Sequence, residues 1–136
     1  MTNLKVINVE NQLFMIENSL NKFTEIENCP VRNVMDRFGD KWSILILLLL
    51  NEEPVMRFNE MYKVITSISQ KMLSVSLKSL EADDLVIRKQ YPQIPPRVEY
   101  MLSKRGQSLI PHLQNLAAWA DQNRVEIEKS RAAFKK

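Results

Sequence analysis

The stretch Ile68–Leu102 reads ISQKMLSVSLKSLEADDLVIRKQYPQIPPRVEYML, and two hydrophobic spacings follow one another within it. From Gln70 to Ala82, three leucines recur at intervals of four and three, which predicts an amphipathic helix, with Ser69 as its N-cap. The runs VIRKQY (86–91) and RVEYML (97–102) are rich in β-forming residues and flank PQIPP, which predicts a hairpin with an irregular loop. A capped helix followed by a short hairpin is typical of a winged helix-turn-helix.

The residues before this stretch supply the other helices of such a fold. Cys29-Pro30 is a boundary, after which residues 31–38 space one helical face that Gly39-Asp40 ends. Residues 41–50 are apolar on nearly all sides, which predicts a buried helix. A short extended piece over 55–58 and a helix from an N-cap at Asn59 through Ile65 complete the series. The expected fold is mainly α with a small β-hairpin wing (α+β), with 70–82 as the helix presented to the major groove.

Two flanking segments carry apolar stripes that need a partner. In the arm, residues 1–28, Leu13, Ile16 and Leu20 recur at helical spacing. Residues 104–136 begin after a second serine cap, Ser103, and form a helix to about residue 130 with a fraying tail. The apolar side of this last helix holds Leu109, Leu113, Leu116 and Trp119. Either the central domain, residues 29–103, covers these stripes or a second subunit does.

Composition excludes several classes of protein. A chain of 136 residues, 45% hydrophobic and 26% charged, is one globular domain with an arm or tail. Two glycines cannot form a glycine-rich phosphate loop, while one histidine and one cysteine exclude HExxH and cysteine-rich zinc sites. No metal, cofactor or catalytic set is therefore expected, and the chain is predicted not to be an enzyme. Its longest apolar run, 44–50, is too short for a membrane span, and without a secretory signal a cytoplasmic protein is expected.

The positive charge is concentrated in one part of the chain. Residues 57–105 hold nine basic and five acidic residues, a net of +4, whereas the remainder nets −1, within a total of +3. Lysine and arginine on such a surface displace counterions from phosphates, which favours double-stranded DNA as the partner. The alternatives are an ordinary solvated surface or a basic face that binds an acidic protein.

Residue types within the basic region suggest which side chains meet the DNA. Glutamine can bond adenine in a bidentate way, lysine can reach guanine, and serine suits bases or phosphates. The candidates on the helix are Ser69, Gln70, Lys71, Ser74 and Lys78. Those on the hairpin are Arg88, Lys89 and Arg97, which would hold phosphate or enter the minor groove. The alternatives are the polar face of any amphipathic helix and a basic hairpin edge that blocks strand addition.

Seven short pieces, in this order and spacing, resemble the HxlR-type family of bacterial transcription regulators, close to the MarR-type winged helices. They are Cys29-Pro30-Val31, Gly39-Asp40-Lys41-Trp42, Arg57-Phe58-Asn59-Glu60, 68–73 (ISQKML), 80–83 (LEAD), 95–100 (PPRVEY) and 102–106 (LSKRG). The resemblance implies a homodimer on a palindromic operator, with its interface around residues 10–28 and 104–130. Arg57 and Asn59 join the candidate DNA contacts through it. Where the family commonly has Asp-Gly, this chain has Asp83-Asp84, and aspartate tolerates the left-handed conformation at some cost.

Cys29 is a candidate redox sensor, because in part of the resembling family a cysteine at this position senses oxidants or electrophiles. It comes just before a predicted helix start, where the macrodipole favours a thiolate. With no second cysteine, oxidation would end as a sulfenic acid, a mixed disulfide or a bridge between subunits. The alternatives are a buried structural thiol and regulation by a small ligand instead.

Overall fold

A computed structural model describes residues 11–13 and 27–134, which fall into two compact units divided after Asp40. The helix expected in the arm, with Ile16 and Leu20, lies outside the described residues, while Leu13 is described and exposed. No helix among the described residues is both long enough and apolar enough to cross a membrane.

In the described part of the first unit, a short helical segment follows Pro30. A π-helical turn, η1 (Val31–Met35), continues directly into α2 (Asp36–Phe38), and Gly39 follows as the C-cap, as expected. Cys29 is buried immediately before this segment, and its carbonyl accepts a hydrogen bond from the backbone N–H of Asn33 at 2.9 Å.

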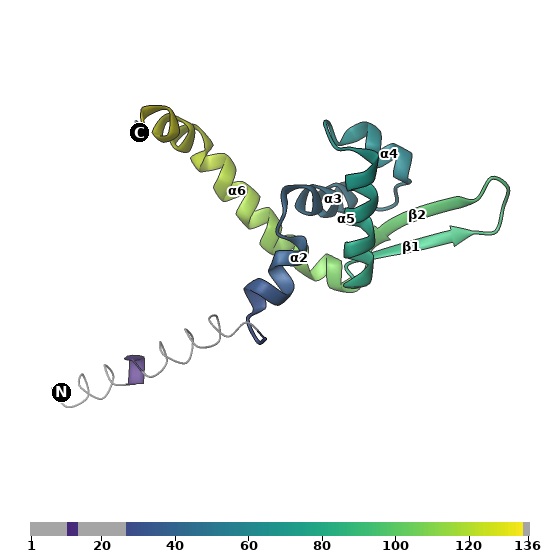
Figure 1. Ribbon diagram of the computed structural model, residues 1–136, viewed down its shortest axis with the longest axis horizontal. Helices are drawn as coiled ribbons and strands as arrows, with labels where there is room; N and C mark the ends of the chain where they lie inside the picture. Colours follow the sequence, from purple (N-terminus) through teal and green to yellow (C-terminus); the bar gives the residue numbers. More distant parts are fainter. Residues whose placement is uncertain (1–10, 14–26, 135–136) are drawn as a thin grey trace. The chain divides into compact units, whose positions relative to one another are not determined.

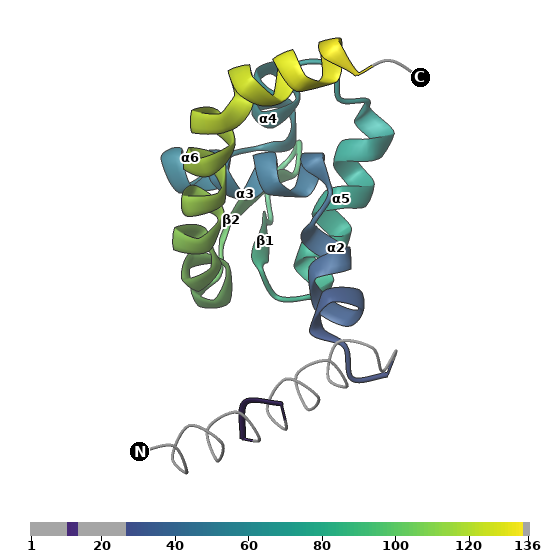
Figure 2. The ribbon, with the colours of Figure 1, turned by 90° about the vertical axis from the view of Figure 1, so that its left-hand side faces the viewer.

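The second unit is built around α3 (Lys41–Glu52), which lies between α5 and α6 in both views (Figures 1 and 2). Ile46, Leu47 and Leu50 of α3 are buried in the core. The prediction of burial on nearly all sides is wrong for one side, because Leu45 is 45% exposed. Apolar character all round a helix does not by itself say that every side finds a neighbour.

Helix α4 (Phe58–Val64) begins earlier than expected. Arg57 is its N-cap, and the carboxylate of Glu60 accepts the backbone N–H of Arg57 at 2.8 Å. The prediction of Asn59 as the cap is therefore wrong, since a glutamate three residues further on satisfies the free N–H of the residue before the helix.

Helix α5 (Gln70–Ala82) and the hairpin have the predicted bounds. Strands β1 (Val86–Tyr91) and β2 (Arg97–Leu102) pair antiparallel, with Val86 opposite Leu102 and Tyr91 opposite Arg97. The hairpin extends away from the helices as a wing (Figure 1). The extended piece expected over 55–58 is reduced to a bridge in which Met56 and Tyr100 exchange backbone hydrogen bonds of 3.1 and 2.8 Å.

Helix α6 (Lys104–Ala133) starts at a junction with the wing. The Ser103 hydroxyl accepts the N–H of Gly106 at 2.9 Å and donates to the carbonyl of Asp84 at 2.6 Å. The N–H of Ser103 donates to the carbonyl of Leu85 at 3.1 Å. A side chain at Gly106 would overlap that same carbonyl oxygen, so only glycine permits this close approach. The end of α5, the root of the wing and the start of α6 thus meet at one place.

Candidate nucleic-acid interface

The start of α5 is held by local hydrogen bonds. The Ser69 hydroxyl accepts the N–H of Met72 at 3.0 Å, which confirms the predicted cap. In the connection from α4, Ser67 adopts a φ of 71°, a left-handed conformation that turns the chain sharply between the two helices. The first turn of α5 therefore has a fixed direction, with its remaining free N–H groups at the helix end.

The two sides of α5 differ in chemistry. The inner side buries Leu73, Leu77 and Leu80 in the core. The outer side exposes Gln70, Lys71 and Lys78, with Ser74 partly covered. Each of these four predicted side chains thus lies on the solvent side of a helix whose position is fixed by three leucines.

Exposure also reveals two apolar side chains that the sequence predictions did not single out. Val75 on α5 is 52% exposed, and Ile94 in the loop at the end of the wing is fully exposed. Val75 could have been found from the spacing, since it comes four residues after Lys71 and three before Lys78.

The turn after α5 adopts the conformation anticipated for Asp83-Asp84. Asp84 has a φ of 56°, in the left-handed region, where the resembling family commonly has glycine. Arg105 at the start of α6 reaches this turn, donating to the carbonyl of Asp83 at 3.2 Å and lying 3.6 Å from the Asp84 carboxylate. The turn is therefore tied to α6.

One face of the wing carries a cluster of charged and aromatic side chains. Arg97 donates from Nε and from a terminal nitrogen to Oε2 of Glu99, at 3.1 and 2.6 Å. The Tyr91 ring lies beneath two cations, with Lys89 at 5.0 Å and Arg97 at 5.2 Å from its centre. The register explains the cluster, because it pairs Tyr91 with Arg97 and Lys89 with Glu99 on the same face.

Arg97 is not a free cation, because it is paired with Glu99. Hydrogen bonds from Arg97, and to a smaller extent one from Tyr91, lower the pKa of the Glu99 carboxyl. In turn, the hydrogen bond to Glu99 raises the pKa of Arg97. Arg97 thus carries its charge beside a fixed carboxylate, although its side chain remains 40% exposed. Arg88 and Lys89 on β1 and Arg57 and Asn59 at the start of α4 are also exposed.

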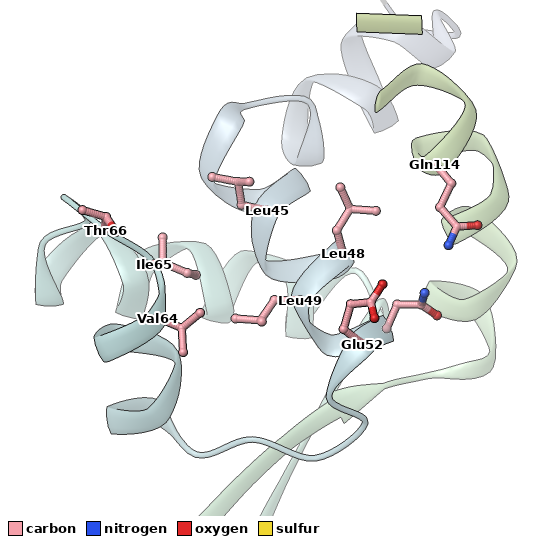
Figure 3. A pocket seen from close by; sticks show the side chains of 9 residues that line it. Leu45, Leu48, Leu49, Glu52, Val64, Ile65, Thr66 and Gln114 are labelled. Atoms are coloured by element: carbon pink, nitrogen blue, oxygen red, sulfur yellow. The ribbon is translucent and has the colours of Figure 1, made fainter. Parts of the chain in front are cut away.

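A pocket of about 540 Å³ opens on the uncovered side of α3. Leu45, Leu48 and Leu49 face Val64 and Ile65 across it, with Glu52 and Gln114 at its other side (Figure 3). Its volume lies within the range that small-molecule sites occupy. Thr66, which also lines it, directly precedes the left-handed Ser67, so the pocket adjoins the connection between α4 and α5.

The family model of the HxlR-like helix-turn-helix matches residues 37–128. The chain belongs to the HxlR-like helix-turn-helix family. A helix-turn-helix transcriptional regulator of Halalkalibacterium halodurans is 42% identical over 102 residues, which cover 75% of this chain and 90% of the relative. The chain is therefore a transcriptional regulator of the DNA-binding helix-turn-helix type.

Two solved structures of regulators in their reduced forms are similar to this chain. The redox regulator HypR in its reduced form is 37% identical with a TM-score of 0.68, covering 74% of this chain and 98% of HypR. The reduced form of the regulator YodB from Bacillus subtilis is 38% identical with a TM-score of 0.60, covering 69% and 92%. These similarities confirm the winged helix-turn-helix fold of the HxlR-like chain.

The candidate dimer residues differ in where the fold leaves them. Leu116 and Trp119 of α6 are 55% and 56% exposed, and Leu109 is partly covered. Leu113 is buried in the core of the single chain, so a surface for a second subunit is better built without it.

Proposed function

We propose that two copies of this regulator bind a palindromic operator, each inserting α5 into the major groove of one half-site. The observation that carries the proposal is the outer side of α5, where Gln70, Lys71 and Lys78 are exposed together on a capped, core-anchored helix. Two such helices on one face of a duplex would be separated by one helical turn, about 34 Å.

The wing adds contacts to the backbone. Arg88 and Lys89 are exposed on β1, and a flexible phosphate contact needs only charge within reach. Arg97, joined to Glu99, acts in this scheme by holding the wing in shape and by pairing with phosphate through its exposed edge.

Fluorescence anisotropy with DNA selected from a random pool tests the proposal. Lys71→Ala should weaken operator binding, whereas Lys129→Ala, which removes another exposed lysine, on α6, should not. Arg88→Ala should lower the slope of log affinity against log salt by about two units, about one for each subunit. Selection that enriches no sequence, or equal affinities for Lys71→Ala and Lys129→Ala, would overturn the proposal and favour an acidic protein partner.

We infer that the middle of α6, around Leu116 and Trp119, joins the two subunits. Leu116 and Trp119 expose large apolar surfaces on a helix that continues to Ala133, well beyond the buried Leu113. A tryptophan that becomes covered removes roughly 150–250 Å² of surface from water. Leu13 in the arm is exposed as well, and we keep it as a separate candidate contact for a second subunit.

Sedimentation equilibrium measures this interface directly. Trp119→Gln should raise the dimer dissociation constant at least about tenfold, since burying a large side chain is worth about 1.5–3 kcal/mol. Val125→Gln is the matched control, because Val125 is 47% exposed but lies nine residues after Leu116, on the opposite side of α6. Identical association of both variants would refute the interface.

We propose Cys29 as the redox switch, supported by the similarity to HypR and YodB. Its thiol is only 2% exposed, so an oxidant reaches it when the segment around it opens locally. Diamide should release DNA from the wild type and leave Cys29→Ser bound. An equal response of both proteins would leave Cys29 as a buried structural thiol.

The pocket beside α3 supports the second mode of control, by a small apolar ligand. A molecule wedged against Ile65 and Thr66 would press on the connection that sets the direction of α5. Nile red is a suitable probe: its fluorescence should rise with the wild type and not with Leu45→Glu, and its binding should weaken operator affinity. If the probe binds without changing operator affinity, the pocket does not control DNA binding.

A further inference from the structure

Val75 lies in the middle of the surface that α5 presents to solvent. It follows Lys71 by four residues and precedes Lys78 by three, so at 3.6 residues per turn the three side chains form one strip. Leu73 and Leu77 lie on the other side of the helix, in the core. The strip therefore reads lysine, valine, lysine along the helix axis.

Neither packing within the chain nor helix propensity explains why a valine stands at this exposed position. The side chain is 52% exposed, and valine is a poorer helix former than the polar residues that usually occupy such a position. Half of its apolar surface thus contacts water between two cations. A partner that meets both lysines at once also covers this valine.

The chemistry of the major groove identifies what the valine meets. Base edges there present hydrogen-bond donors and acceptors, which an apolar side chain cannot use, and one apolar group, the 5-methyl of thymine. Lys71 and Lys78 suit phosphate or guanine, and the short side chain between them reaches the base edges only when α5 lies deep in the groove.

We propose that Val75 packs against the 5-methyl group of one thymine in each half-site and so determines specificity at that position. This inference rests on the proposed function, in which α5 enters the major groove. Met72, the other large apolar residue exposed on α5, is 41% exposed. It follows Lys71 by one residue, which turns it about 100° around the helix, closer to the buried side.

Replacement of thymine by uracil provides the test, because it removes the 5-methyl group and leaves base pairing intact. Symmetric uracil pairs are placed one position at a time in an operator selected with the wild-type protein, and affinity is measured at fixed salt. At one position, uracil should weaken wild-type binding by about tenfold or more, from about threefold to fivefold in each half-site. Val75→Ala should bind the thymine and uracil operators within twofold of each other.

Two further variants make the result specific. Val125→Ala, which trims a similarly exposed valine on α6, should keep the full uracil effect. The inference is overturned if no uracil position weakens the wild type, if Val75→Ala keeps the effect, or if Met72→Ala abolishes it instead. Failure of the proposed function is a different result, since selection would then yield no operator at all.

Discussion

Replacing Gly106 by alanine should destabilise the protein, although alanine is the better helix former. A methyl group at this position would overlap the carbonyl oxygen of Leu85 and lie 3.1 Å from its carbon and 3.2 Å from Cδ2 of Leu102. The oxygen belongs to the backbone and cannot rotate away. The start of α6 must therefore move off the root of the wing.

The expected loss follows from the contacts at this junction. Inserting a methyl group into a tightly packed site costs about 1–3 kcal/mol. Moving α6 also stretches the hydrogen bonds from Ser103 to Leu85 and to Asp84, each worth about 1 kcal/mol. Helix propensity returns about 1 kcal/mol, so the net change is about 2–4 kcal/mol less stability.

Urea unfolding followed by circular dichroism measures this change. With a slope of about 2 kcal/mol per molar urea, the midpoint should fall by about 1–2 M. Gln107→Ala, an exposed position one residue further along α6, is the control and should change stability by less than about 0.5 kcal/mol. Because a dimer would make stability depend on concentration, all proteins are compared at the same concentrations. A Gly106→Ala midpoint equal to that of Gln107→Ala would refute the close approach of α6 to Leu85.

Three further predictions use the same unfolding assay. Ser69→Ala should lose about 1 kcal/mol by removing the acceptor for the N–H of Met72, and Ser69→Asp should retain most of the stability; equal losses would argue against capping. Asp84→Gly should gain up to about 1 kcal/mol by relieving the left-handed backbone, because the exposed ion pair that it loses with Arg105 at 3.6 Å is weak; a loss of stability would contradict this. Since Arg97 lowers the pKa of Glu99 in the folded chain, the carboxylate stabilises the fold above its unfolded pKa and ceases to do so as pH falls through the folded value. Glu99→Gln should thus be less stable than wild type at pH 7 and match it well below pH 4, whereas a difference independent of pH would exclude the ionised carboxylate as the cause.

Local signals in the sequence were sufficient for most of the second unit. The leucine spacing and Ser69 defined α5, and the β-rich runs around a proline-rich loop defined both strands. These features depend on neighbours within a few residues along the chain. The cap of α4 was missed because Glu60 and Asn59 both suit a helix start, and only the backbone geometry decides which one is used.

The site was less predictable where it depends on pairing across the fold. Arg97 reads as a free cation in the sequence, and its bond to Glu99 exists because the strand register brings alternate side chains to one face. Likewise, the open side of α3 could not be deduced, since an apolar helix gives no sign of which neighbours cover it. The outward lysines of α5 were predictable because the leucines on the other side fix the rotation of the helix.

Because the junction at Ser103 and Gly106 is tight, α6 acts as a lever that moves together with α5 and the wing. The helix has 30 residues, which at 1.5 Å per residue gives a length of about 45 Å. Hydrogen bonds of Ser103 hold the start of α6 directly against the turn between α5 and the wing. In a dimer joined near Trp119, 15 residues or about 22 Å from the start of α6, a tilt of about 10° would displace the recognition helix by about 4 Å, roughly one base-pair step along DNA. A small change in the angle between the two subunits is therefore enough for an effector to move both α5 helices out of register with the operator.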